Sequence, residues 1–166
     1  CNGVNITNKL NNILLVEQEN ENLGFVGAPK EVNKSIIEKI VKEKKIPVIA
    51  PLGLDKNKQV YNINADEVAG SIAKKLIARR LIIMSDVEGV LDKHKNLIPE
   101  IDTVIINNLI KDNTIIGGMI PKIKNCLDVA CKGVKGVCII DGRVKSSILF
   151  ELLSEKGSGT LIRKWT

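Results

Sequence analysis

The feature that most constrains the fold of this sequence is an alternation of short apolar runs with amphipathic segments. Apolar runs of strand length occupy 46–53, 81–85, 134–140 and 159–164, and segments with helical spacing occupy 65–78, 117–133 and 143–157. Apolar residues that recur every three or four positions are typical of helices, and short continuous apolar runs are typical of buried strands. The alternation predicts an α/β fold, an αβα sandwich with a mainly parallel central sheet and ligands at the carboxyl ends of its strands.

Three further segments refine this prediction. Residues 30–44 predict an amphipathic helix whose apolar stripe consists of Val32, Ile36, Ile37, Ile40 and Val41. Run 46–53 predicts a buried parallel strand, the alternation in 58–64 predicts part of a hairpin, and 100–113 predict a short helix. Because the sequence contains no internal repeat and no linker of low complexity, we expect residues 1–166 to form one domain.

Charge and composition argue against several classes of partner. The net charge of +6 comes mostly from lysines spread over the expected helix surfaces, which is typical of solvated faces. Nucleic-acid sites stack bases on aromatic side chains, and this chain has four aromatic residues, Phe25, Tyr61, Phe150 and Trp165. No apolar run reaches the roughly 18 residues of a membrane span. We therefore expect neither a nucleic acid nor a membrane as partner.

The termini and the cysteines suggest an intracellular protein from which a part is missing. The chain begins at Cys1 in a polar, loop-like stretch without signal-peptide features, so we expect a missing N-terminal portion. Its four cysteines form no Cys-x-x-Cys pair and the single histidine lies in a loop, which argues against a structural zinc site. Cys126 and Cys138 lie in apolar runs and are expected to be buried thiols in a reducing compartment.

A first polar motif, "YNINADEVAG", covers 61–70 at the start of the expected helix. Asn64 is well placed as the N-cap, Glu67 completes a capping box, and Asp66 in the first turn suits the helix dipole. Capping leaves Asn62 unexplained. The local pattern favours capping and keeps a ligand site as the second interpretation.

Two more turns are candidate ligand sites. Ser85 and Asp86 end a buried strand, and Gly89 in the next turn would let the backbone approach a ligand; an ordinary loop exit is an equal alternative. Gly117 and Gly118 open a helix whose free N–H groups would suit phosphate.

The helix after the glycine pair carries two lysines in its first turns. Pro121 fits the first turn of that helix, and Lys122 flanks its apolar stripe while Lys124 points away from it. Lys122 is expected either to extend along the apolar surface to solvent or to reach a phosphoryl group.

Five segments, "LGFVG", "NINADEVAG", "LIIMSDVEGVLD", "GGMIPKI" and "IIDGR", resemble in this order the acetylglutamate kinases, a branch of the amino acid kinase family. The resemblance covers nearly the whole chain. It implies a carbamate kinase-like αβα fold, of which this chain is the C-terminal, ATP-binding part. The family's N-terminal, acetylglutamate-binding part, with its Lys-x-Gly-Gly strand end, has no counterpart here. We expect the chain to fold but not to catalyse phosphoryl transfer by itself.

The resemblance implies transfer of the γ-phosphoryl group of ATP, with Mg²⁺ bridging its phosphates, to the side-chain carboxylate of N-acetyl-L-glutamate in arginine biosynthesis. Asn62 would hold the acetylglutamate, with Asn64 in the same motif. Asp66 would orient catalytic lysines, and Lys122 would bind the transferring phosphate. The nucleotide would be contacted by Ser85, Asp86, Val87, Gly89, Leu91, Gly117 and Gly118. No general base is needed, because a carboxylate with a pKa of about 4.3 is already ionised.

The C-terminal segment resembles the arginine-inhibited, hexameric branch, in which Glu151, Gly157 and Gly159 would contact arginine. Lys145 and Ser146 replace a Pro-His pair there, so one expected arginine contact is absent. Relatives in cyanobacteria and plastids also bind the PII signalling protein, and the cytoplasm or a plastid stroma is the expected location. The alternatives are another amino acid kinase, such as a uridylate or glutamate 5-kinase, and a non-catalytic module that binds an effector or a partner.

Overall fold

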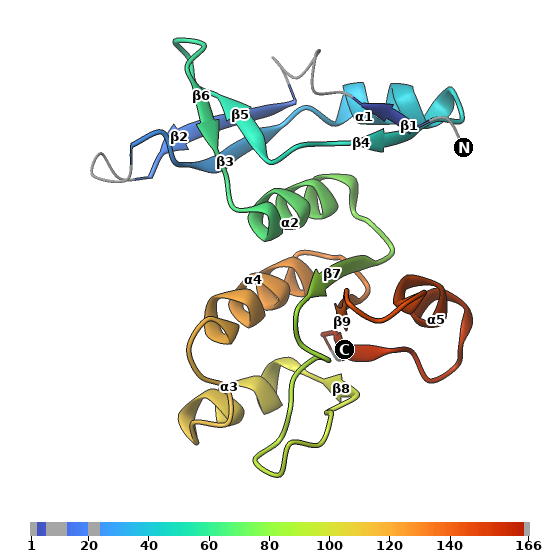
Figure 1. Cartoon of the computed structure of the whole chain (residues 1–166). Helices are drawn as coiled ribbons and strands as arrows, with labels where there is room; N and C mark the ends of the chain where they lie inside the picture. Colours follow the sequence, from blue (N-terminus) through green and yellow to red (C-terminus); the bar gives the residue numbers. More distant parts are fainter. Residues whose placement is uncertain (1–2, 6–12, 20–23, 165–166) are drawn as a thin grey trace. The chain divides into compact units, whose positions relative to one another are not determined.

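The structure is a computed structural model that describes residues 3–5, 13–19 and 24–164. Its helices and strands are interspersed along the chain (Figure 1), as is typical of an α/β fold. The chain divides into two compact units, Cys1–Leu76 and Ile77–Thr166, and each is described by itself. Cys1, Leu23 and Trp165, which entered the sequence arguments, lie outside the described residues.

In its described residues, the first unit contains two small sheets and two helices. In one sheet, β1 (Gly3–Asn5) pairs in parallel with β4 (Ile46–Val48). The other has the order β3-β2-β5-β6, with β2 at Leu14–Gln18, β3 at Gly27–Val32, β5 at Leu52–Leu54 and β6 at Val60–Asn62. The helices are α1 (Lys34–Lys42) and α2 (Ala65–Leu76).

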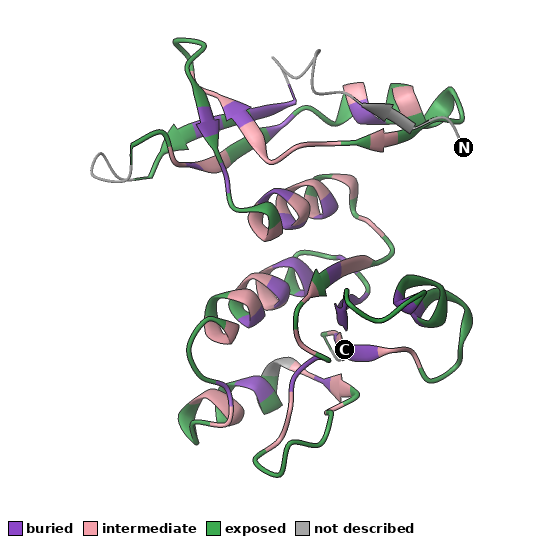
Figure 2. Ribbon diagram, in the orientation of Figure 1, coloured by how far each residue is buried: buried purple, intermediate pink, exposed green. Residues whose placement is uncertain are grey.

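One apolar core holds this unit together. Ile13, Leu14, Val32 and Ile63 are almost fully buried, and Ile72 and Leu76 of α2 pack against the same cluster. Buried segments shown in purple in Figure 2 accordingly run through β2, β6 and α2. This packing helps to fix the start of α2, because Ile63 lies two positions before the helix and is buried in the core.

Two sequence predictions for this unit were wrong in detail. The helix expected over 30–44 begins at Lys34, because Val32 pairs with Leu14 in the antiparallel β2–β3 ladder. Val41, expected on the buried stripe, is 55% exposed. The run 46–53 is two short strands, since Pro51 interrupts it, and β4 is largely exposed rather than buried. The expected hairpin is confirmed as the antiparallel pair β5–β6.

The second unit is built around a mixed four-stranded sheet of order β7-β9-β10-β8. Its strands are β7 (Leu81–Ser85), β8 (Glu100–Ile101), β9 (Val137–Asp141) and β10 (Gly159–Ile162). Its helices are α3 (Thr103–Lys111), α4 (Met119–Cys131) and α5 (Ser147–Leu153). Strands β7 and β9 run parallel, whereas β10 runs antiparallel to β9.

Strand β9 is the centre of this unit. All five of its residues are buried, and Ile123, Cys126 and Val129 of α4 are fully buried as well. Cys126 and Cys138 are buried as expected, while Cys131 is exposed. The other predicted helices and strands of this unit are found, although α3, α4 and α5 are shorter than the predicted segments. Glu100 and Ile101, which were expected in the helix over 100–113, instead form strand β8, because they pair with β10. Among the described residues, no helix is both long and apolar enough to cross a bilayer.

Candidate functional site

The predicted cap at the start of α2 is confirmed by its geometry. The Asn64 side-chain oxygen accepts hydrogen bonds from the backbone N–H of Asp66 at 2.9 Å and of Glu67 at 3.4 Å. Two of the otherwise unpaired N–H groups of the first turn are thereby satisfied. The cap fixes the backbone of the first turn, which carries the half-buried Asp66.

Asn62 takes no part in the cap of α2. It is the last residue of β6, and its backbone N–H donates to the carbonyl oxygen of Phe25 at 2.9 Å. Tyr61 and Ile63 are buried on either side, so Asn62 and Asn64 both lie on the exposed face of this extended segment. Within the part of the chain that the structure describes, the Asn62 side chain makes no hydrogen bond. Its amide is therefore open to a ligand.

The same helix end carries a perturbed carboxyl group. Burial, and then the charge of Glu19, raises the pKa of Glu67 above its ordinary value, while Lys74 opposes the shift. Glu67 is half-buried in the first turn of α2, next to the fully packed Val68.

The carboxyl ends of β7 and β9 lie side by side in the second unit. Ser85 and Asp141 are register partners in the parallel ladder, and the N–H of Gly142 donates to the Ser85 carbonyl oxygen at 2.8 Å. The Ser85 hydroxyl donates to Asp86 at 3.3 Å. The predicted turn after β7 therefore lies at the carboxyl edge of two parallel strands, where α/β folds bind ligands.

An ion pair that sequence reasoning did not assign occupies the same edge. Arg143 donates from Nε and Nη2 to the two carboxylate oxygens of Asp141, at 2.9 and 2.7 Å, and from its backbone N–H at 2.9 Å. Hydrogen bonds from Arg143 lower the pKa of Asp141 to about 2. The "IIDGR" motif contains both residues, but only the strand register shows that they adjoin Ser85.

The turn after β7 is held by a buried threonine of β10. The Thr160 hydroxyl accepts a hydrogen bond from the N–H of Val90 at 2.8 Å and donates to the Ile98 carbonyl oxygen at 2.7 Å. Gly89 has φ of +146°, and a Cβ there would lie 2.6 Å from the Thr160 hydroxyl oxygen. Glycine is thus needed at position 89 so that the turn can pack on Thr160. Sequence reasoning missed this role of Thr160. Val87 and Leu91 are half-buried in the same turn.

The glycine pair before α4 has a different character. Gly117 has φ of +58°, and a Cβ on either Gly117 or Gly118 would meet no atom within 4 Å. The N–H groups of Met119 and Ile120 already bond to the carbonyl oxygens of Ile116 and Gly117, at 3.3 and 3.2 Å. The free N–H groups expected at this helix start are therefore fewer than predicted, because two of them close the turn.

Lys122 lies in the second turn of α4, one position before the buried Ile123. It is half-buried, whereas Lys124 is exposed, as the helical wheel predicted. It stands four positions after Gly118, next to Ile123 of the buried stripe of α4.

The predicted effector residues form a buried polar cluster. Glu151 accepts hydrogen bonds from Arg80 at 3.3 Å, from the Cys138 thiol at 3.0 Å and from the N–H of Ser158 at 2.9 Å. Gly157 has φ of +68°, with the space for its Cβ filled by Glu151. Partners within the chain therefore surround Glu151, and the predictions did not include Arg80 or Cys138.

Gly159 has a structural reason to be glycine. A Cβ on it would lie 2.0 Å from the backbone carbonyl oxygen of Ile139, the residue before its register partner Ile140 on β9. The β9–β10 ladder thus requires glycine at this position.

The predicted residues fall into two sets. Asn62, Asn64 and Asp66 belong to the first unit, and the remaining predicted residues belong to the second, so no geometry joins the two sets. Within the second unit, the β7 turn and the "IIDGR" motif are brought together through the Ser85–Asp141 register.

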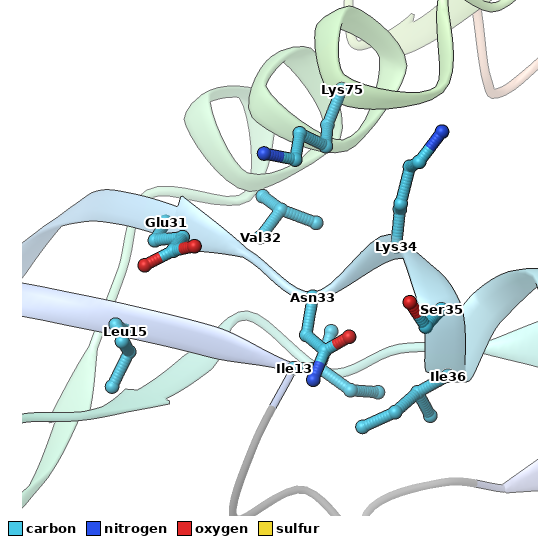
Figure 3. A pocket seen from close by; sticks show the side chains of 9 residues that line it. All are labelled: Ile13, Leu15, Glu31, Val32, Asn33, Lys34, Ser35, Ile36 and Lys75. Carbon is cyan, nitrogen blue, oxygen red and sulfur yellow. The ribbon is translucent and has the colours of Figure 1, made fainter.

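The first unit also has a cavity of about 510 Å³ that the predictions did not include. Figure 3 shows it between β2, β3 and the start of α1, with Glu31 on one side and Lys34 and Lys75 above it. None of the predicted site residues lines it. Its lining mixes charged groups with Ile13 and Val32 of the core.

The residues that the structure describes contain no group of three or more His, Cys, Asp or Glu side chains that could hold a metal ion.

Comparisons with known proteins agree on one family. The family model described as "Amino acid kinase family" matches residues 3–141. An acetylglutamate kinase of Pelagibacter ubique is 64% identical over 164 residues, which are 99% of this chain and 57% of that protein. The chain therefore spans little more than half the length of this relative.

Solved structures support the same fold. A protein of Streptococcus mutans UA159 superposes with a TM-score of 0.81 at 29% identity, over 97% of this chain and 60% of that one. A carbamate kinase from Giardia lamblia superposes with a TM-score of 0.64 at 22% identity, over 84% of this chain and 46% of that one. The predicted carbamate kinase-like α/β fold is confirmed.

Proposed function

The chain belongs to the amino acid kinase family, and we propose that it is the ATP-binding part of an enzyme that phosphorylates the side-chain carboxylate of N-acetyl-L-glutamate. The observation that carries this proposal is the 64% identity to an acetylglutamate kinase over 99% of the chain. We further propose that both compact units are parts of one domain in the complete protein.

The proposed chemistry needs positioning and positive charge rather than a base. The acceptor carboxylate is ionised at neutral pH, so it can attack the γ-phosphorus of ATP directly. Phosphoryl transfer is then accelerated by alignment of the reactants and by cations near the developing charge. Lys122 is proposed as that cation, and ATP as the nucleotide, with Mg²⁺ supplying further charge neutralisation on its phosphates when bound.

The first unit is proposed to contribute the acceptor side. Asn62 is exposed at the end of β6, and its side-chain amide is available to hydrogen-bond the acetylglutamate. Asp66 is proposed to orient catalytic lysines from a helix start that Asn64 holds rigid.

The second unit is proposed to contribute the nucleotide side. Ser85, Asp86, Val87, Gly89 and Leu91 are proposed to contact the nucleoside at the carboxyl end of β7. Gly117 and Gly118 are proposed to let phosphates approach the backbone, because a Cβ at either position would meet only open space.

Effectors and assembly are proposed from the resemblance alone. Arginine is proposed to bind at Glu151, Gly157 and Gly159. Because Glu151 already accepts a hydrogen bond from Arg80, the bound arginine would have to displace Arg80 or share Glu151 with it. A homohexamer, a PII partner and a cytoplasmic location are proposed on the same ground, with bacterial relatives favouring a bacterial cytoplasm over a plastid. Calorimetric titration of the complete protein with arginine tests the effector proposal.

An acceptor panel tests the proposed function. The chain is fused to the region of the Pelagibacter ubique protein that lies outside the matched residues, and the fusion is assayed with MgATP and each acceptor. We expect phosphorylation of N-acetyl-L-glutamate and none of L-glutamate or UMP, while the 166-residue chain alone is inactive. Preferred phosphorylation of UMP or L-glutamate would instead support another amino acid kinase. ATP binding without transfer to any acceptor would support the non-catalytic module.

A further inference from the structure

Helix α5 has a buried polar side, while its apolar side chains are exposed. Its two buried residues are Ser147 and Glu151, which are four positions apart and so share one face of the helix. The apolar side chains of α5 are each at least 40% exposed, and green therefore covers most of this helix in Figure 2. Apolar packing contributes little to holding α5 on the second unit. Contacts of its polar side have to do so instead.

Hydrogen bonds from three residues outside the helix reach this polar side. The Arg80 guanidinium donates from Nη1 to the carbonyl oxygen of Glu151 at 2.9 Å and to its Oε1 at 3.3 Å. The Cys138 thiol donates to Oε1 at 3.0 Å, and the N–H of Ser158 donates to Oε2 at 2.9 Å. The Ser158 hydroxyl also donates to the carbonyl oxygen of Ser147 at 3.0 Å. Glu151 is therefore the main point at which α5 is attached.

Arg80 supplies the charge that this attachment needs. The Glu151 side chain is 8% exposed, whereas the Arg80 side chain is 40% exposed. A carboxylate that is removed from water is costly unless a cation and hydrogen bonds compensate it. Among the residues that the structure describes, Arg80 is the one cation paired with Glu151. Without Arg80, a buried anion would lie in a helix that has little apolar packing to hold it.

The acceptors that bind Arg80 are those that a free arginine would need. Glu151 is the one residue of the proposed effector site with a side chain that can accept from a guanidinium. Gly157 lies against its Oε2, since a Cβ there would be 2.8 Å away, so no ligand group fits between them. Free arginine carries the same planar set of donors as Arg80. It would therefore bind in place of Arg80 rather than beside it.

We propose that Arg80 is a built-in occupant of a guanidinium site on Glu151, and that occupancy of this site holds α5 in place. The inference rests on the effector site of the proposed function, to which it adds a competitor and a responding helix. Because a tethered group competes at a high effective concentration, free arginine binds weakly while Arg80 is present. Either guanidinium keeps α5 attached, and an empty site releases it.

Removal of the Arg80 side chain would leave this site vacant, which makes the inference testable in the 166-residue chain. Arg80→Ala is compared with Arg79→Ala, a matched loss of charge from the adjacent exposed residue. Each variant is titrated calorimetrically with L-arginine, with methylguanidinium, and with methylammonium as a cation that lacks the planar donors. Hydrogen exchange of the amides of 147–158 reports how firmly α5 is attached.

Two further variants take account of the buried charge that Arg80→Ala leaves behind. Arg80→Lys keeps the positive charge without the planar donors. The double variant Arg80→Ala with Glu151→Gln removes the negative charge, and with it the acceptor for a guanidinium. Melting temperatures are measured with and without methylguanidinium, so that a variant that folds only in its presence also reports occupancy of the site.

We expect Arg80→Ala to bind L-arginine at least ~tenfold more tightly than the unsubstituted chain does. Exchange over 147–158 should be faster in Arg80→Ala and should be slowed again by methylguanidinium but not by methylammonium. A smaller increase is expected in Arg80→Lys. Arg79→Ala should behave as the unsubstituted chain, and the double variant should not respond to methylguanidinium.

Equal affinity for L-arginine with and without the Arg80 side chain would overturn the inference. So would an Arg80→Ala variant in which methylguanidinium restores neither folding nor the slow exchange of α5. The proposed kinase is tested separately, because phosphorylation of N-acetyl-L-glutamate by the fusion protein depends on neither result.

Discussion

Asn64 accepts a hydrogen bond from the backbone N–H of Asp66 at 2.9 Å, so the residue that caps α2 also fixes the backbone of the proposed lysine organiser. The sequence left helix capping and a ligand site as alternative interpretations of residues 61–70. In the structure, the two roles are compatible. A rigid helix start is what an organising carboxylate needs, since small displacements of a catalytic group are costly.

Substitutions at these two positions should separate stability from activity. Asn64→Ala removes the cap and is expected to cost about 1 kcal/mol, which lowers the melting temperature of a chain of this size by about 2–4 °C. Asp66→Asn is expected to leave the melting temperature nearly unchanged and to lower phosphoryl transfer sharply in the fusion protein. If Asp66→Asn mainly lowered the melting temperature, its role would be structural.

A matched pair of glycine substitutions distinguishes packing from ligand approach. Gly159→Ala places a Cβ 2.0 Å from the Ile139 carbonyl oxygen, and we expect a loss on the order of 4 kcal/mol, or failure to fold. Gly118→Ala places a Cβ in open space at φ of −65°, so its stability should change by less than about 0.5 kcal/mol. Its affinity for MgATP should nevertheless fall. Unchanged affinity in Gly118→Ala would remove this glycine from the phosphate site.

The Asp141–Arg143 pair predicts a stability change in acid. The pKa of Asp141 is lowered from 3.8 to about 2 in the folded chain, so its stabilising contribution is present above about pH 4 and is lost as the pH falls through 2. Urea unfolding at several pH values should therefore show a smaller decline between pH 4 and pH 2 for Asp141→Asn than for the unsubstituted chain. Parallel curves for the two proteins would contradict this assignment.

The buried thiol of Cys138 predicts a loss of stability at alkaline pH. Burial, followed by the hydrogen bond to Glu151, raises the pKa of Cys138 from 9.0 to about 12. Stability from this group is present below pH 9 and is lost as the pH rises toward 12, and Cys138→Ala should flatten that decline. At pH 8 the exposed Cys131 should react with a thiol reagent while Cys138 does not, and Cys131→Ser is the control. Rapid reaction of Cys138 in the folded chain would contradict its burial.

Elements set by local sequence could be predicted, and those set by pairing could not. Helices α2 and α4 were predictable because Asn64 caps the first and Gly133 follows the second. The start of α1 was misplaced because Val32 suits both a helical stripe and a strand, and only its pairing with Leu14 decides between them. Strand β2 was missed altogether, since five residues carry little periodic signal.

The same distinction applies to the candidate site. Asn64, Ser85 and Gly118 were identified from motifs that are continuous in the sequence. Arg143 was not assigned, because its relation to Ser85 depends on the register between β7 and β9. The internal partner of Glu151 was missed for the same reason, as Arg80 lies 71 residues away in the chain.

The turnover of the fusion protein with Lys122→Ala tests the central claim most directly. If Lys122 stabilises the transferring phosphoryl group, kcat for N-acetyl-L-glutamate should fall by about 10²–10³, as when a donor to a transition-state charge is removed, with little change in melting temperature or in KM for the acceptor. Lys124→Ala, an exposed lysine two positions later, is the control and should keep full activity. An unchanged kcat in Lys122→Ala, or an equal loss in both variants, would contradict the assignment of phosphoryl transfer to this chain.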